Sequence, residues 1–423
     1  MKNNRISSYL VFGLLLLLTF SLKCWNVWLP LIGHKFVATL MTGCRYALLL
    51  ACTSFCLVAY RNHGVSKEYR WGILLFLVYT IFLYYQIIVN PLIPLLYLQH
   101  APLTAIDIAF STLVIIMMGY ISNYCNKYIN YLSFCRLSVG VIVIFLVLYF
   151  SIIDYRLYGL GLITPKFEYE SMLPDNFIDP LRLSSYIGFM AVCVLSIWDK
   201  WVKNRKASIW ISSILLLSCL LLLFLIGERG PTLFLLITSV FVLHARGVLQ
   251  KSVFKWTLLT LCVVGISQLM PFDLLSSLAP ESMDKFNNTM EGGASNRFGH
   301  GDAIYNLSIS QILDSPWLGS YFRILSSNRI GVYPHNIILE FLMTFGVIFT
   351  IPTLCLIFKA LIKSYKMIMK NNPYSFWAIF FIYTFLCRMT SGTIVSDLFF
   401  WVPFFFVLSI NQNKSSLYGI PSC

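Results

Sequence analysis

The stretch "GVYPHNIILEFLMTFGVIFTI" (residues 331–351) decides the fold class, because it leads from a polar start directly into a long apolar run. His335 and Asn336 stand ahead of the run, and Glu340 lies inside it. The run continues to residue 358, which gives the ~20 residues that a helix needs to cross the hydrocarbon core of a bilayer. Titratable groups are costly in that core and often mark functional positions. The stretch therefore predicts a transmembrane helix with three candidate functional residues at its start.

The whole chain has the composition of a membrane protein. Of its 423 residues, 58% are hydrophobic and only 11% are charged, whereas a soluble domain carries about 25% charged residues. The mean hydropathy is +0.77. We therefore expect an all-α, polytopic integral membrane protein.

Apolar runs that could cross a bilayer recur about twelve times. We expect a single transmembrane domain over residues 1–423, in which the apolar run after the basic start is an uncleaved first helix. Two long outer loops are expected, at 154–182 and at 271–335, and the larger one lies between spans nine and ten. Within it, residues 302–315 have the apolar spacing of a short helix on the outer face of the membrane. The expected spans are residues 8–22, 36–60, 72–89, 102–122, 133–153, 183–198, 207–226, 230–245, 253–270, 336–358, 374–390 and 393–410.

Lys and Arg gather in alternate loops, and this pattern predicts the orientation. The segments expected inside hold more than half of the 31 Lys and Arg residues, whereas the outside connection "NPLIPLLYLQHA" (residues 90–101) holds none. By the positive-inside rule, both termini are then cytoplasmic. The same distribution explains the net charge of +14 without nucleic acid as a partner, and no nucleic-acid-binding signature is present.

Several catalytic signatures are absent from the sequence. There is no D-x-D pair, P-loop, H-E-x-x-H or G-x-S-x-G motif. Most of the 12 cysteines lie singly in apolar runs, where they are expected to act as small packing residues. The sequence therefore predicts no metal ion and no cofactor.

Three residues expected at the outer face could act on a lipid diphosphate. Arg229 lies in "IGERGPTL", Arg297 in "SNRFGHGD", and His335 at the end of the large loop. A guanidinium binds a diphosphate through paired, charge-assisted hydrogen bonds. An imidazole can accept a proton near neutral pH. The combination suggests transfer of a group from a lipid diphosphate donor.

Each candidate also has a structural explanation. An outer-loop arginine most often contacts lipid headgroups or a carboxylate, and Asn336 is a strong helix-capping residue. We expect Glu340, one turn later, to bind Arg388 or another interior cation rather than to act in catalysis. The other charges within spans are expected to form structural ion pairs; these are Arg45, Asp107, Arg388 and Asp397.

Three elements in the second half of the chain carry a family resemblance. "GERGPTLFLL" opens a span with Arg229, preceded by Glu228. "SNRFGHGDAIYNLSISQILDSPWLGS" contains Arg297 and ends in a Pro-x-x-Gly turn at Pro316 and Gly319. "PHNIILEFLMTFG" has an H-N-x-x-L-E pattern, with a glycine ten residues after the asparagine. Its matching residues are His335, Asn336, Leu339, Glu340 and Gly346.

These elements, with twelve spans and the largest outer loop ahead of the H-N pattern, resemble the bacterial O-antigen polymerase and O-antigen ligase superfamily. Glu228 departs from that family, in which a small or polar residue is commoner. The resemblance implies a metal-independent glycosyltransferase of lipopolysaccharide biosynthesis in the bacterial inner membrane. It implies a donor in the form of a glycan on undecaprenyl diphosphate, contact with membrane lipid, and a chain-length regulator as a further partner.

The resemblance also implies roles for the candidate residues. Arg229 and Arg297 would bind the diphosphate and stabilise the leaving group. His335 would orient or deprotonate the acceptor hydroxyl, or contribute to the diphosphate site. Asn336 and Glu340 would support it at the substrate-binding site. Further arginines would line the glycan path; these are Arg182, Arg323 and Arg329.

Two alternatives remain open at the level of sequence. A ligase shares these elements but moves the glycan onto lipid A-core; the proline before His335 and the sequence "RGP" look more like polymerases, and Phe349 departs from many ligases. A transporter or flippase for lipid-linked sugars would place its polar groups near the bilayer midplane and often shows an internal repeat. This chain shows no repeat and concentrates its candidates on one face, so we favour the polymerase.

Overall fold

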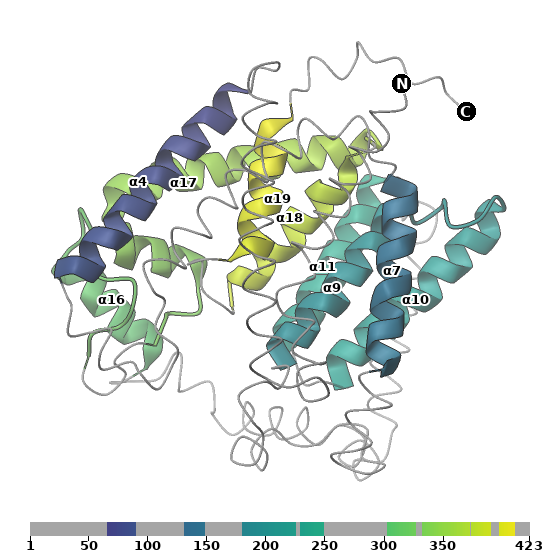
Figure 1. Ribbon diagram of the computed structural model, residues 1–423, viewed down its shortest axis with the longest axis horizontal. Coiled ribbons are helices and arrows are strands. Elements are labelled where there is room, and N and C mark those ends of the chain that lie inside the picture. Colours follow the sequence, from purple (N-terminus) through teal and green to yellow (C-terminus); the bar gives the residue numbers. More distant parts are fainter. Residues whose placement is uncertain are drawn as a thin grey trace, which may run out of the picture.

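Helices form every regular element in the part of the chain that the computed structural model describes (Figure 1). This part comprises residues 66–89, 131–148, 180–225, 229–248, 303–326, 332–372, 374–390 and 397–410. Its helices are α4 (Lys67–Val89), α7 (Tyr131–Leu148), α9 (Pro180–Ser196), α10 (Arg205–Leu225), α11 (Arg229–Ala245), α16 (Ile304–Asp314), α17 (Ile337–Met369), α18 (Ser375–Arg388) and α19 (Leu398–Ser409). The all-α expectation is confirmed for these residues.

Eight of the twelve expected spans coincide with one of these helices, and α16 coincides with the expected amphipathic helix. Two described segments are long and apolar enough to cross a membrane, namely Arg205–Leu223 and Ile337–Met369. The described apolar helices Tyr131–Ile144, Leu183–Ser196, Gly230–Ala245, Ser375–Arg388 and Phe399–Ser409 are shorter. The expected spans 8–22, 36–60, 102–122 and 253–270, with Arg45 and Asp107, lie outside the described residues.

Helix α18 is the central element of the described part, because it packs against α9, α11, α17 and α19 (Figure 1). All of its residues from Ser375 to Thr384 are buried. Phe380 packs edge-on against Phe189 of α9, with ring centroids 5.1 Å apart. Trp377 stacks on Phe406 of α19 at 4.5 Å. A helix that is apolar on all sides is typical of a core position, so α18 positions its neighbours.

One end of the helices gathers the basic segments, and we call it the basic end. It contains the ends of α9 and α11 and the start of α18. The Arg246 guanidinium joins all three, since it donates hydrogen bonds to Leu195 O (2.6 Å), Ser196 O (3.2 Å) and Ser375 Oγ (3.2 Å). Burial lowers the pKa of Arg246, but a guanidinium remains protonated in proteins.

Helix α17 is longer than the expected span 336–358, because it continues to Met369. The expected span ends at residue 358 because Lys359 is the first charged residue after the apolar run. A helix does not end there, because lysine is a good helix former and its charge can reach water from a surface position. Lys363 donates to Leu408 O at 2.9 Å near the end of α19, so this extension reaches the basic end.

Candidate functional site

Asn336 fixes the start of α17. Its backbone is extended, and its Oδ1 accepts hydrogen bonds from the amides of Ile338 (3.0 Å) and Leu339 (3.1 Å). Its Nδ2 donates to Met389 O at 3.0 Å, just beyond the end of α18. The helix-cap interpretation of Asn336 is therefore confirmed, and the same side chain also joins the start of α17 to the end of α18. We call this end of the helices, opposite the basic end, the site end.

An ion pair lies beside this junction. Arg388, the last residue of α18, donates from Nε to Asp397, which immediately precedes α19. Their side chains are 14% and 7% exposed. The structural ion pair expected from the sequence is confirmed for these two residues, and it holds the end of α18 against the start of α19.

Glu340 lies one turn into α17 and is completely buried. Tyr79 of α4 lies close enough to Glu340, Arg323 and Asp397 to interact with them electrostatically. The Tyr79 hydroxyl is buried and has no hydrogen-bond partner among the residues that the structure describes. The sequence of the apolar run 72–89 does not distinguish Tyr79 from the other residues of the run. Its polar surroundings come from α17 and from the loop before α17, which the fold brings close to α4.

Arg323, Tyr333 and His335 form a stack of side chains ahead of α17. The Arg323 guanidinium carbon lies 4.9 Å from the centroid of the Tyr333 ring. The Tyr333 ring in turn lies 4.2 Å from the His335 ring, with an angle of 52° between the planes. Tyr333 is also near enough to Arg388 to interact with it electrostatically. Two of the predicted site residues, Arg323 and His335, are thus brought together by an aromatic residue that sequence reasoning missed.

The backbone of His335 is unusual. Its φ of 54° lies in the left-handed region, which few residues other than glycine adopt and which costs ~1 kcal/mol or more. This backbone conformation directly precedes the capping residue of α17, beside the end of α18.

The Pro-x-x-Gly turn docks into a kink of α17. Gly346 has non-helical angles (φ 60°, ψ −172°) that interrupt the helix. The backbone groups near this break bond to the turn instead: Ser320 N donates to Met343 O (2.8 Å) and Val347 N donates to Pro316 O (2.8 Å). A Cβ at Gly346 would overlap the backbone of Trp317 and Leu318. The break in α17 therefore provides the hydrogen-bonding groups that bind the turn, and the turn occupies the space beside Gly346.

Gln311 of α16 holds the segment that follows this turn. Its Nε2 lies within hydrogen-bond distance of Ser320 Oγ (2.9 Å), Tyr321 O (3.1 Å) and Arg323 O (3.0 Å). Its Oε1 accepts from Leu325 N at 3.0 Å. One buried amide thus fixes the backbone on both sides of Arg323, which explains how a loop residue keeps a defined place beside Tyr333.

The structure places the other predicted arginines only in part. Arg229 is the first residue of α11 and Arg182 stands in the first turn of α9, but their side chains lie outside the described part. A Cβ at Gly230 would come within 3.0 Å of Thr390 Oγ1, so the start of α11 lies beside the end of α18. Arg297, Arg329 and His300 lie outside the described residues.

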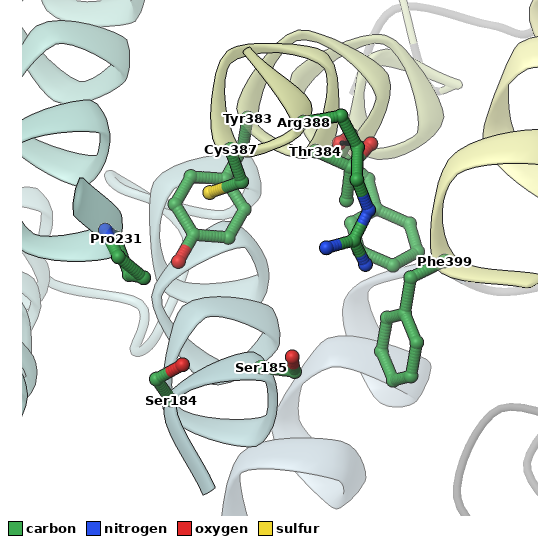
Figure 2. A pocket seen from close by; sticks show the side chains of 9 residues that line it. Ser184, Ser185, Pro231, Tyr383, Thr384, Cys387, Arg388 and Phe399 are labelled. Carbon is green, nitrogen blue, oxygen red and sulfur yellow. Dashed lines mark hydrogen bonds between the residues drawn. The ribbon is translucent and has the colours of Figure 1, made fainter. Parts of the chain in front are cut away.

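A pocket opens between α9, α11, α18 and α19 at the site end (Figure 2). Ser184 and Ser185 line it from α9, two and three residues beyond Arg182, and Pro231 lines it from α11, two residues beyond Arg229. Figure 2 shows the Arg388 guanidinium extending into this space. The remaining lining residues are Phe380, Tyr383, Thr384, Cys387 and Phe399.

These contacts bring several polar residues of distant segments to the site end, and we call them the polar cluster. Among the described residues, no three His, Cys, Asp or Glu side chains converge in a way that would hold a metal ion. The polar cluster consists of Tyr79, Arg323, Tyr333, His335, Asn336, Glu340, Arg388 and Asp397.

Comparison of the chain with models of protein families, with curated proteins and with solved structures gives no match.

Proposed function

We propose that this chain is a multi-pass glycosyltransferase of the O-antigen polymerase type, which acts at the outer face of the bacterial inner membrane. It moves a glycan from undecaprenyl diphosphate onto a second lipid-linked repeat unit. One observation carries the proposal: the end of α18 contacts both Asn336, next to His335, and Gly230, next to Arg229. A candidate base and a candidate diphosphate ligand that are far apart in the sequence thus share one end of the helices.

In the proposed reaction, a hydroxyl of the acceptor sugar attacks the anomeric carbon of the donor. The new carbon–oxygen bond forms while the bond from that carbon to the diphosphate oxygen breaks. His335 takes the hydroxyl proton. The electrons of the broken bond leave with the lipid diphosphate, whose charge Arg229 and Arg297 stabilise. Arg323 lines the glycan path beside His335, and no metal ion is required.

Helix α16 supports the membrane setting of this proposal. It exposes Ile309 and Leu313, and the turn that follows exposes Trp317 and Leu318. Tryptophan and large apolar side chains at the end of a helical bundle suit the boundary between headgroups and acyl chains. This surface therefore favours membrane lipid as a contact of the site end.

The position of the polar cluster favours transfer over transport. Transporter sites lie near the bilayer midplane between repeated elements, whereas the cluster, apart from Tyr79 in the middle of α4, gathers where α17 and α19 start and α18 ends. A ligase would use the same residues with lipid A-core as the acceptor. The resemblance of "RGP" and of the proline before His335 to polymerases makes polymerisation the activity that we propose.

The test is complementation of a polymerase-null strain with His335→Ala, Arg229→Ala or Arg297→Ala. We expect each variant to reach the membrane and to lose the lipopolysaccharide ladder, because each removes a group that acts on the donor or acceptor. Matched controls are His244→Ala and Arg205→Ala, at exposed positions in the last turn of α11 and the first turn of α10. Both controls should give full ladders.

The null strain itself separates the three activities. Single repeats attached to core indicate a missing polymerase, and polymer that stays on the lipid carrier indicates a missing ligase. Single repeat units trapped inside the cell indicate a missing flippase. Full-length ladders from all three membrane-inserted variants would refute the catalytic assignment.

A further inference from the structure

The Tyr333 ring is the common contact of a predicted substrate-binding arginine and the predicted base. The Arg323 guanidinium carbon lies 4.9 Å from its centroid and the His335 ring lies 4.2 Å from it. A guanidinium packs favourably over the electron-rich face of a phenol ring, and the His335 ring packs against the same phenol ring at an angle of 52°. Arg323 also lies 5.7 Å from the Phe322 ring, so its guanidinium is held among aromatic groups.

The backbone around this stack is fixed at several points. Ile324 N donates to Val332 O at 2.9 Å, which joins the Arg323 segment to the Tyr333 segment. Gln311 accepts from Leu325 and donates toward Arg323 O. Asn336 anchors the other side through α17 and Met389. Hydrogen bonds therefore hold both backbone segments that carry the three side chains.

His335 has a particular need for support. Its backbone is in the left-handed region at φ 54°, a conformation that persists only where the surroundings hold it. A ring packed 4.2 Å away supplies such support directly to the side chain. Loss of the ring would remove this contact from the His335 imidazole, while the helix cap at Asn336 would remain.

We propose that Tyr333 is a positioning residue, which sets the orientation of the His335 imidazole and its spacing from the Arg323 guanidinium. The inference rests on the proposed function, because it assigns His335 and Arg323 to one substrate: Arg323 contacts the glycan while His335 acts on the hydroxyl. The ring of Tyr333, not its hydroxyl group, makes both contacts. A phenylalanine should therefore replace it and an aliphatic residue should not.

The first readout is the kinetics of the full-length purified protein with an undecaprenyl-diphosphate-linked oligosaccharide. Tyr333→Leu should lower kcat about 10- to 100-fold with little change in KM, because misplacing a catalytic group by about 1 Å has effects of that size. Tyr333→Phe should restore kcat to within about threefold of wild type. Tyr365→Leu is a matched control, because Tyr365 lies in the part of α17 that extends toward the basic end and packs on Phe241 of α11, with ring centroids 5.7 Å apart.

The second readout does not depend on activity. Diethyl pyrocarbonate modifies accessible imidazoles, and mass spectrometry of the His335 peptide gives its rate, with exposed His244 as the internal reference. Tyr333→Leu should raise the His335 rate several-fold, and Tyr333→Phe should not change it. If the modification rates change as expected but the wild-type protein forms no polymer, the proposed function is wrong. The positioning of His335 by Tyr333 is then still supported. Equal losses of kcat in the Phe and Leu variants, or an unchanged His335 rate in Tyr333→Leu, would overturn the role of the ring.

Discussion

Asn336 shows how one side chain can determine the geometry of a site. Its amide oxygen satisfies two amides at the start of α17, which have no partners within the helix. Its amide nitrogen satisfies Met389 O at the end of α18. The cap and the interhelical bond are made by different atoms of the same amide, so His335 next to it is fixed relative to two helices.

The Arg388–Asp397 pair should behave as a buried pair rather than a surface one. We expect Arg388→Met or Asp397→Asn alone to lower the free energy of unfolding by ~3–5 kcal/mol, because each leaves a buried charge without its counterion. The double replacement Arg388→Met/Asp397→Leu should cost less than the two single changes together. Denaturant unfolding of the detergent-solubilised protein measures these differences.

The chain contains a matched surface pair as a control. Arg205 and Asp199 lie 3.7 Å apart with side chains that are 75% and 37% exposed. Such a pair contributes about 1 kcal/mol or less, so Arg205→Ala should have little effect on stability. If the single replacements at Arg388 and Asp397 cost no more than Arg205→Ala, the pair does not hold α18 and α19 together.

At the scale of elements, the kink at Gly346 is the feature that places α17. The docked turn replaces helical hydrogen bonds with bonds to Pro316 and Ser320. It thereby joins α16 and its following loop, which includes Arg323, to the helix that begins beside His335. The site residues of the loop and of the helix are thus held by backbone bonds.

The kink needs glycine at position 346 for two reasons, the positive φ and the close approach of the Trp317 backbone. Alanine substitutions at three glycines distinguish the two effects. Gly346→Ala combines a positive φ of 60° with overlap on the Trp317 backbone, whereas Gly247→Ala has a φ of 70° and free space, and Gly140→Ala in α7 has neither problem. We expect Gly346→Ala to lower the thermal midpoint most and Gly247→Ala to cost ~1–2 kcal/mol. Gly140→Ala should be neutral or stabilising by up to ~1 kcal/mol. Thermal unfolding in one detergent compares them; equal midpoints for Gly346→Ala and Gly247→Ala would contradict the docking.

Sequence reasoning predicted the helical elements well where apolar periodicity or length determines them. It located a helix at each expected span within the described part and at α16. It misplaced the end of α17, since hydropathy falls at Lys359 while helical hydrogen bonding continues. It also assigned Arg182 to a loop, although α9 already begins at Pro180, a residue that suits the first position of a helix.

The candidate site could be predicted only in part, for a physical reason. His335, Asn336 and Glu340 were distinguishable because polar groups are rare at the edge of an apolar run. Tyr333, Tyr79 and Gln311 were not, because an aromatic or amide residue is common in loops and helices of any membrane protein. Their importance arises from contacts with other segments of the chain, such as the ring contact of Tyr79 on α4 with Phe345 on α17.

At the scale of the whole molecule, the described helices separate two kinds of polar group. The basic end carries Lys363 and Arg246, which bond to backbone carbonyls at helix ends. The site end carries the polar cluster and the pocket beside α9 and α11 (Figure 2). In the orientation that we propose from the positive-inside rule, the basic end is cytoplasmic, and the site end faces the side on which the proposed lipid-linked substrate is found.

We propose that this chain by itself transfers a glycan from a lipid diphosphate donor. The most direct measurement uses purified protein in vesicles, a labelled undecaprenyl-diphosphate-linked repeat unit and a chelator of divalent cations. We expect wild-type protein to release lipid diphosphate and to form products of two or more repeats, and His335→Ala to do neither while His244→Ala behaves as wild type. Release without product growth in the wild type, or equal polymer from wild type and His335→Ala, would contradict the account.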